Sequence, residues 1–176
     1  MTLFNRLPLH KQVNEIVGDF TSLILVEIDN TVPESFIGRA KRVQQQLWQD
    51  LDHIHVNGVQ VLRELAKRQK NRQRALMPIV FTSTLTLDFD QNTGLPPLGE
   101  IVHSITQTPQ VWLDHQVSEE KGSLLFNWDA IDELFPDKML DDMFEAYCGL
   151  LERLAVSETA WLDTTTDALL PQWQIS

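Results

Sequence analysis

Cysteine is nearly absent from this chain, whose 176 residues include only Cys148. A single cysteine excludes an internal disulfide and fits a reducing compartment, so we expect a cytoplasmic protein. No apolar run approaches the ~20 residues that a membrane-spanning helix requires. The first residues also lack the charged-then-apolar pattern of a secretory signal. The 43% of hydrophobic and 22% of charged residues are typical of a globular domain with a sizeable core.

Positive charge is scarce, because 14 basic residues face 25 acidic ones and the net charge is -11. This balance argues against nucleic acid as a partner, since phosphate binding needs clustered positive charge. Such a cluster exists only locally, where a basic stripe could dock an acidic partner or form the solvated end of a helix. The stripe consists of Arg63, Lys67, Arg68, Lys70, Arg72 and Arg74.

Signatures of metal and nucleotide sites are missing as well. His53 and His55 are the only two histidines close in sequence, with no nearby acidic or cysteine cluster beyond Asp50 and Asp52. Structural zinc sites show tighter patterns, so we expect no metal. The chain has no P-loop, dinucleotide fingerprint or nucleophile elbow, which argues against those enzyme classes.

The apolar periodicity predicts an α/β fold with a mixed β-sheet covered by helices. A capping box spanning Thr31 to Glu34 opens the first predicted helix, and Gly58 opens the second. The predicted helices cover 33–51, a short stretch from 58, and 138–155. The predicted strands cover 16–29, 76–87, 101–107, 110–118 and 123–128.

Two of these strands have a polar face. In 110–118 the alternation places Gln110, Trp112, Asp114 and Gln116 on one side. In 76–87 it places Thr82, Thr84 and Thr86 on one side. If the faces meet, a carboxylate lies beside hydroxyls in a partly enclosed cleft, which suits proton transfer. The alternative is a solvent-facing sheet surface, where Thr and Gln are common.

Three segments resemble, in order, sequence motifs of the heterocyclization domain of nonribosomal peptide synthetases, a specialised relative of the condensation domain. They are 18–25, 78–85 and 106–114, the last followed after thirteen residues by Trp128 and Asp129. The resemblance covers about 5–155 and implies that 1–155 is the C-terminal lobe of the domain, with a chloramphenicol-acetyltransferase-like fold. Residues 156–176 resemble a linker toward an adenylation domain. The N-terminal half of the family domain, with its paired-aspartate motif, has no counterpart here.

The resemblance implies an activity. Such a domain condenses a carrier-bound acyl or peptidyl thioester with Cys, Ser or Thr, then cyclodehydrates the product to a thiazoline or oxazoline. Asp114 is the implied acid–base group, and Thr82 orients it or the substrate. Other implied substrate-tunnel residues are Gln110, Trp112, Gln116, Thr84 and Ser83. The implied carrier-docking candidates are Arg63, Lys67, Arg68 and Lys70.

The implied partners are peptidyl or aryl carrier proteins, the N-terminal half of the same domain and an adjacent adenylation domain, in siderophore-type secondary metabolism. Phosphopantetheine is carried by the carrier proteins, and we expect no cofactor on this lobe. Two other functions remain open: a catalytically incomplete lobe with a structural or docking role, and an ordinary condensation lobe that forms only amides. Because the lobe lacks the opposing wall of the tunnel, we expect the isolated chain to be inactive.

Overall fold

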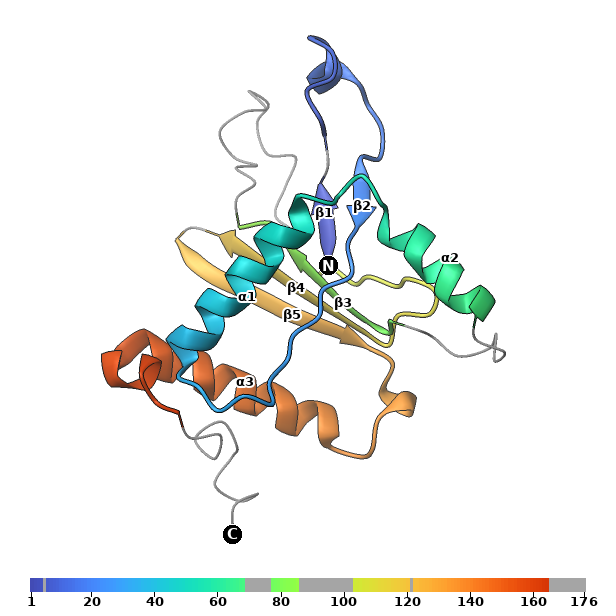
Figure 1. Cartoon of the computed structure of the whole chain (residues 1–176). Helices are drawn as coiled ribbons and strands as arrows, with labels where there is room; N and C mark the ends of the chain where they lie inside the picture. Colours follow the sequence, from blue (N-terminus) through green and yellow to red (C-terminus); the bar gives the residue numbers. More distant parts are fainter. Residues whose placement is uncertain (5, 69–76, 86–102, 121, 165–176) are drawn as a thin grey trace. The chain divides into compact units, whose positions relative to one another are not determined.

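A computed structural model describes the chain except for residues 5, 69–76, 86–102, 121 and 165–176. Figure 1 traces the chain from its N-terminus to its C-terminus, and the chain divides into two compact units. Unit 1 comprises Met1–Leu25 and His55–Ile131, and unit 2 comprises Val26–Ile54 and Asp132–Ser176. Each unit is described by itself below.

A three-stranded sheet forms the centre of unit 1, in the order β3 (Ile79–Ser83), β4 (Leu113–Glu120), β5 (Ser123–Ala130). The β3 and β4 strands are parallel, whereas β4 and β5 form an antiparallel hairpin. The sheet is therefore mixed, as the sequence predicts. Leu113 and Val117, which are 4% and 7% exposed, place the buried side of β4 in the core of this unit.

A second, two-stranded antiparallel sheet joins β1 (Thr2–Phe4) to β2 (Thr21–Leu23). The prediction contained no strand at the position of β1, and the strand predicted at 16–29 forms only at β2. Arg6 organises the long connection between them, which includes η1 (Val13–Glu15). Its guanidinium lies 3.9 Å from the centre of the Phe20 ring and donates to main-chain carbonyls of the connection, so one side chain secures the loop.

The helix α2 (Gly58–Arg68) begins where the sequence predicts. The side-chain oxygen of Asn57 accepts a hydrogen bond from the N–H of Val59 at 2.9 Å, which satisfies one free donor of the first turn. Gly58 is buried against β2, and a Cβ there would lie 2.8 Å from the carbonyl oxygen of Leu23. The absence of a side chain is what permits this close approach.

Two helices, α1 (Phe36–Leu51) and α3 (Met139–Val156), dominate unit 2. The short helices η2 (Asp132–Leu134) and η3 (Glu158–Trp161) flank α3. Trp161 packs edge-on against Phe36, with ring centres 5.3 Å apart, and its indole N–H donates to the carbonyl of Leu154. Packed chain thus continues past residue 155, where the sequence suggests that the linker begins.

Helix α1 starts at Phe36, three residues later than predicted, and the capping box is not its cap. The N-cap is Ser35, whose hydroxyl accepts from the N–H of Gly38. Glu34 instead forms an ion pair with Arg42 at 2.6 Å. Asp29 accepts both the N–H and the hydroxyl of Thr31 in a local turn, which holds the pKa of its carboxyl below the usual value. Local partners compete successfully with the predicted cap.

Other boundaries differ too. Residues 103–107, part of the strand predicted at 101–107, form no strand. The strand predicted at 110–118 begins three residues later, at Leu113, while β5 matches its prediction closely. Among the described residues, no helix is long and apolar enough to cross a membrane.

Candidate functional site

The pairing of β3, β4 and β5 decides which side chains share a face. Asp114 is opposite Val80 of β3 and Asp129 of β5. Gln116 is opposite Thr82 of β3 and Asn127 of β5. Because residues directly opposite in a ladder point to the same side, the polar faces expected on two separate strands form one surface. All of these residues belong to unit 1.

A compact hydrogen-bond cluster surrounds Asp114 on this face. Thr106 Oγ1 lies 2.7 Å from Asp114 Oδ2 and 2.8 Å from Asp129 Oδ2. The main-chain N–H of Thr106 also donates to Asp129 Oδ2, at 2.7 Å. Gln116 Nε2 donates to Thr106 Oγ1 at 2.9 Å and to Asp114 Oδ2 at 3.1 Å. The Thr106 hydroxyl thus lies within hydrogen-bonding distance of both carboxylates, and its single proton can be donated to either one.

The two oxygens of Asp114 have different surroundings. Oδ2 accepts from Thr106 and Gln116, whereas Oδ1 is buried and has no hydrogen-bond partner among the described residues. A buried carboxylate oxygen without a donor is energetically costly and usually has a functional explanation. One oxygen is thus fixed by two donors, and the other has none among the described residues.

His115 lies on the opposite face of the sheet, as the alternation predicts. Its ring packs edge-on between Phe81 at 5.2 Å and Trp128 at 5.9 Å. Burial lowers the pKa of His115 below its ordinary value, and the nearby charge of Asp114 opposes this with a smaller effect. Near neutral pH the ring is therefore uncharged, and its position separates it from the polar cluster.

The hydroxyl residues predicted in and after β3 do not all lie on one face of the sheet. Thr82 lies on the face of Asp114, and its hydroxyl donates to Thr2 Oγ1 at 3.1 Å. Ser83 pairs with Val117, which places it on the opposite face. Thr84 follows the strand, and both its N–H and its hydroxyl donate to the carbonyl of Val117. Thr86, the third member of the predicted face, is outside the described residues.

Gln110 and Trp112 are not part of the strand that carries Asp114. Gln110 is exposed in a turn closed by the N–H of Val111 and the carbonyl of Thr108. Its φ is 69°, a left-handed conformation that a strand residue does not adopt. Trp112 occupies the bend before β4, where its N–H donates to the carbonyl of Pro78 at 2.7 Å. The prediction of one continuous polar face from 110 to 116 is therefore wrong for its first half.

Comparison with known proteins places this chain in a family context. No protein-family model matches the chain. It is 44% identical over 164 residues to pyochelin synthetase PchF of Pseudomonas aeruginosa, an alignment that covers 93% of this chain and 9% of PchF. It is 38% identical over 180 residues to phenyloxazoline synthase MbtB of Mycobacterium tuberculosis, covering 99% of the chain and 12% of MbtB. The chain thus spans about a tenth of the length of these curated relatives.

A solved structure agrees. The cyclization-docking bidomain of the nonribosomal peptide synthetase EpoB from Sorangium cellulosum matches with a TM-score of 0.76 and 48% identity. The match covers 92% of this chain and 32% of that one. This chain belongs to the cyclization domains of nonribosomal peptide synthetases. The chloramphenicol-acetyltransferase-like fold expected from the sequence follows, because that is the fold of these structural neighbours.

The Asp114 cluster includes two residues, Thr106 and Asp129, that lie in the motif of 106–114 with Trp128 and Asp129 but were given no role in the sequence analysis. Thr106 lies in an irregular segment, so no periodicity indicates it. Asp129 had a detectable signal, because Gly122 marks a tight turn (φ 77°) centred between Asp114 and Asp129. A hairpin folded at that turn places these two carboxylates directly opposite each other.

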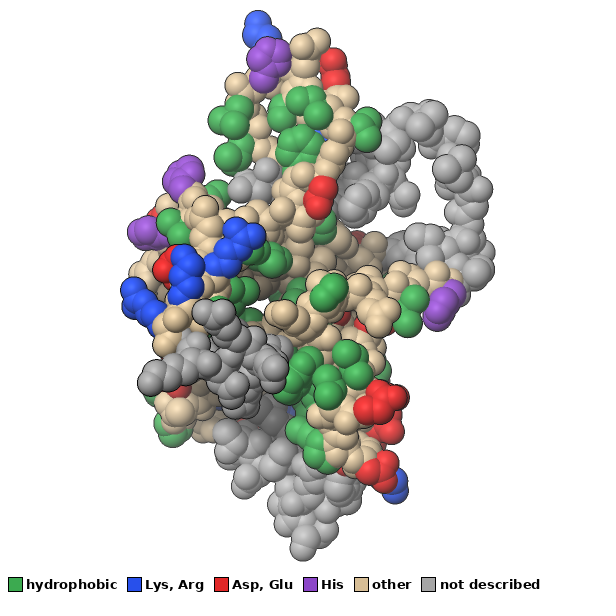
Figure 2. All heavy atoms as spheres, turned by 90° about the vertical axis from the view of Figure 1, so that its right-hand side faces the viewer, with side chains coloured by type: hydrophobic (Ala, Val, Ile, Leu, Met, Phe, Trp, Pro, Cys, Tyr) green, Lys and Arg blue, Asp and Glu red, His purple; other side chains and the backbone are tan. Residues whose placement is uncertain are grey.

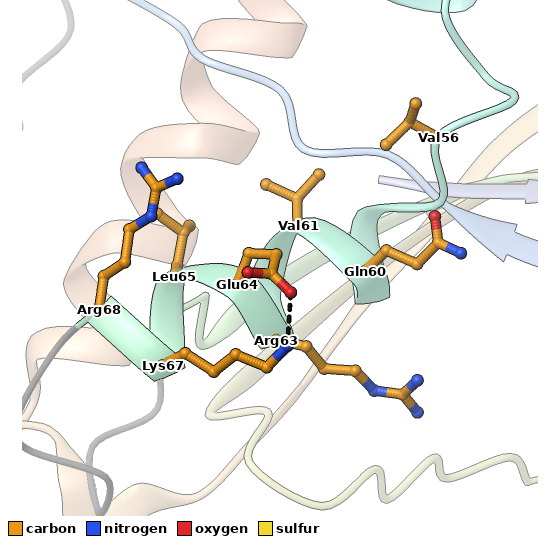
Figure 3. Close-up of a pocket in the computed structure, with 8 residues that line it drawn as sticks. All are labelled: Val56, Gln60, Val61, Arg63, Glu64, Leu65, Lys67 and Arg68. Carbon is orange, nitrogen blue, oxygen red and sulfur yellow. Dashed lines mark hydrogen bonds and ion pairs between the residues drawn. The ribbon is translucent and has the colours of Figure 1, made fainter.

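The basic residues of α2 form a second candidate surface on this cyclization lobe. Lys and Arg side chains gather over α2 (Figure 2), where Arg63, Lys67 and Arg68 are exposed. The three line a hollow along the helix (Figure 3). Glu64 lies among them and pairs with Lys67 at 2.6 Å, which reduces the positive charge. Lys70 and the rest of the predicted stripe are outside the described residues.

The part of the chain that the structure describes contains no cluster of metal-ligating side chains. Within it, no group of three or more His, Cys, Asp and Glu side chains could hold an ion. The hollow beside α2 is lined by none of the residues of the Asp114 cluster, so the two candidate sites are distinct.

Proposed function

We propose that this chain supplies one wall of a heterocyclization site, with Asp114 as the acid–base group that closes a thiazoline or oxazoline ring. The observation that carries the proposal is the carboxylate of Asp114, whose Oδ2 is held by two donors while Oδ1 is buried and without a partner among the described residues. The names of the relatives, a pyochelin synthetase and phenyloxazoline synthases, support ring formation as the reaction class.

For a cysteine acceptor, the proposed reaction has three steps. An upstream carrier-bound thioester first acylates the amine of cysteine, forming an amide and releasing the upstream thiol. The cysteine sulfur then adds to the amide carbon, and its proton passes to the former carbonyl oxygen. Finally the C–O bond breaks, the oxygen leaves as water with the proton from nitrogen, and a C=N bond forms. Asp114 relays the proton in each of these last two steps, accepting one proton and returning one each time, so it is unchanged at the end.

Thr82 is proposed to contact the substrate rather than to orient Asp114. Its hydroxyl lies on the same face, opposite Gln116, and its hydrogen bond goes to Thr2. The donors that reach Asp114 are instead Thr106 and Gln116. A hydroxyl beside the carboxylate can hold the oxygen that leaves as water, which is where charge develops.

The partners of the proposed reaction are carrier proteins that deliver substrates on phosphopantetheine, together with the N-terminal half of the domain and an adjacent adenylation domain. The lobe proper would extend past the expected boundary at 155 to include η3, and the end of the chain would lead to the adenylation domain. The exposed basic residues of α2, Arg63, Lys67 and Arg68, suit an acidic carrier surface. Docking there would be weakened by salt.

The test is a complete domain in which this lobe is fused to the first half of a cyclization domain. Carrier-bound acyl donor and carrier-bound cysteine are added, and products on the downstream carrier are weighed by mass spectrometry. We expect a product lighter than the amide by one water. Asp114→Asn, which keeps the shape of the side chain, should lower ring formation by about 100-fold or more and leave the amide.

Two outcomes contradict the proposal. If Asp114→Asn closes the ring as fast as the unaltered lobe, Asp114 has no part in cyclization. If the unaltered fusion makes only the amide, while the same first half joined to its own second half makes the ring, this lobe belongs to an ordinary amide-forming domain. Ser104→Ala, which changes an exposed hydroxyl, is the matched control and should behave like the unaltered lobe.

A further inference from the structure

Two side chains hold the Asp114 carboxylate and a third holds one of these two, and the proposed function so far gives the three no role. They come from three places: Thr106 from the irregular segment before β4, Gln116 from β4 itself and Asp129 from β5. We propose that they are positioning residues that orient Asp114 for ring closure, and that they serve ring closure far more than amide formation. This inference rests on the proposed function of Asp114.

The first step of the argument is the freedom of a carboxylate. The terminal torsion of an Asp side chain is broad, so nothing intrinsic decides which oxygen faces the substrate. Two donors from different elements remove that freedom, because Thr106 and Gln116 both bind Oδ2 of Asp114. Gln116 Nε2 also donates to Thr106 Oγ1, so the two donors fix each other. Neither donor binds Oδ1, which is buried and has no partner among the described residues.

Asp129 acts through Thr106. The segment 103–108 has no strand pairing that would hold Thr106 in place. Its main-chain N–H and its hydroxyl both reach Oδ2 of Asp129, which fastens the segment to the sheet. Two carboxylates repel each other at this range unless donors lie between them. The N–H of Thr106 donates to Asp129, which leaves the single hydroxyl proton available to Asp114, so removing Asp129 would free the segment that carries this hydroxyl.

The expected preference for ring closure over amide formation follows from the different requirements of these two steps. Joining an amine to a thioester depends chiefly on bringing the two carriers' substrates together. Ring closure additionally needs one proton removed and one delivered at the same centre, which only a correctly turned carboxylate can do. A displacement of about 1 Å in a catalytic group can lower a rate by about 100-fold. Loosening Asp114 should therefore let the open amide accumulate.

The experiment uses the fused domain described above and measures the ratio of ring to open amide in a single turnover. Thr106→Val keeps the volume and the main-chain N–H but removes the hydroxyl, and it should lower that ratio by about 10- to 100-fold. Thr106→Ser restores a hydroxyl and should recover the ratio to within about 3-fold. Gln116→Leu and Asp129→Ala should both lower the ratio, while Ser104→Ala should not.

Each outcome of this experiment either supports or overturns the positioning role. An unchanged ratio in Thr106→Val and Gln116→Leu overturns the inference, as does an equal loss of amide and ring, which indicates a merely structural role. If Thr106→Val does not fold, as judged by urea unfolding, Gln116→Leu carries the test alone, because it leaves the main-chain anchor intact. Asp114→Asn distinguishes the two proposals. If that variant still closes the ring, the proposed function of Asp114 is wrong. If Asp114→Asn loses ring closure while Thr106→Val closes the ring normally, only the positioning role is wrong.

Discussion

At the scale of single residues, His115 lies on the face of the sheet opposite the Asp114 cluster, and its ring packs between aromatic side chains. Burial between Phe81 and Trp128 lowers its pKa, so the folded chain keeps the ring neutral at pH values where the unfolded chain begins to bind a proton. The stability that His115 contributes is therefore fully present above the ordinary value of 6.5. It is lost as the pH falls through the lowered pKa of the folded state.

We expect His115→Phe, which keeps an aromatic ring but cannot titrate, to change this pH dependence. Urea unfolding between about pH 7 and pH 5 should show a steeper loss of stability in the unaltered chain than in the variant. The difference between the two curves is the measurement, since other groups titrate in both. Parallel curves would mean that the packed ring does not resist protonation.

Single residues also show where sequence reasoning succeeds and where it stops. Thr82 and Asp114 could be placed on one face because alternation is fixed in a strand, and only the pairing of their strands was unknown. Gln110 could not be placed, because its left-handed conformation depends on the turn around it and no glycine marks the position. Thr106 lies in the 106–114 motif, but no periodicity could give it a role, since only tertiary contacts hold it.

At the scale of elements, the contact between α2 and β2 depends on Gly58. A Cβ at this position would meet the main-chain oxygen of Leu23 at 2.8 Å, and main chain cannot move aside as a side chain can. Gly58→Ala should therefore destabilise the chain by about 1–3 kcal/mol, even though alanine favours a helix by about 1 kcal/mol over glycine.

Gly149 in α3 is the matched control, because a Cβ there meets nothing within 4 Å. Gly149→Ala should leave stability unchanged or raise it by up to about 1 kcal/mol. Urea unfolding of both variants measures the contrast. Opposite signs are expected, and a stabilising Gly58→Ala would show that the helix start can move away from β2.

The short helix η3 extends the folded chain beyond its expected end. The prediction failed here because residues 156–162 have no period of their own, and their order comes from Trp161 against Phe36 and Leu154. Trp161→Phe should cost about 1 kcal/mol, the value of one hydrogen bond, while Trp161→Ala should cost about 3 kcal/mol. If thermal unfolding shows that both variants lose negligible stability, η3 does not stabilise the packing of α1 and α3.

At the scale of the whole molecule, the chain corresponds to only part of the solved structure that it resembles. The chain matches 32% of the EpoB bidomain, and the proposed cluster lies wholly within unit 1. The proposed opposing wall would come from the N-terminal half of the domain.

We therefore expect the chain alone to form no thiazoline from carrier-bound substrates, although its Asp114 cluster is complete. Holding two reactants in place contributes about 7–11 kcal/mol to such reactions, and one wall cannot hold both carriers' substrates. Mass spectrometry of the downstream carrier after prolonged incubation measures the product. Adding the N-terminal half of a cyclization domain should produce the ring, and Asp114→Asn in that mixture should not. Ring formation by the chain alone would show that Asp114 and its positioning residues need no second wall.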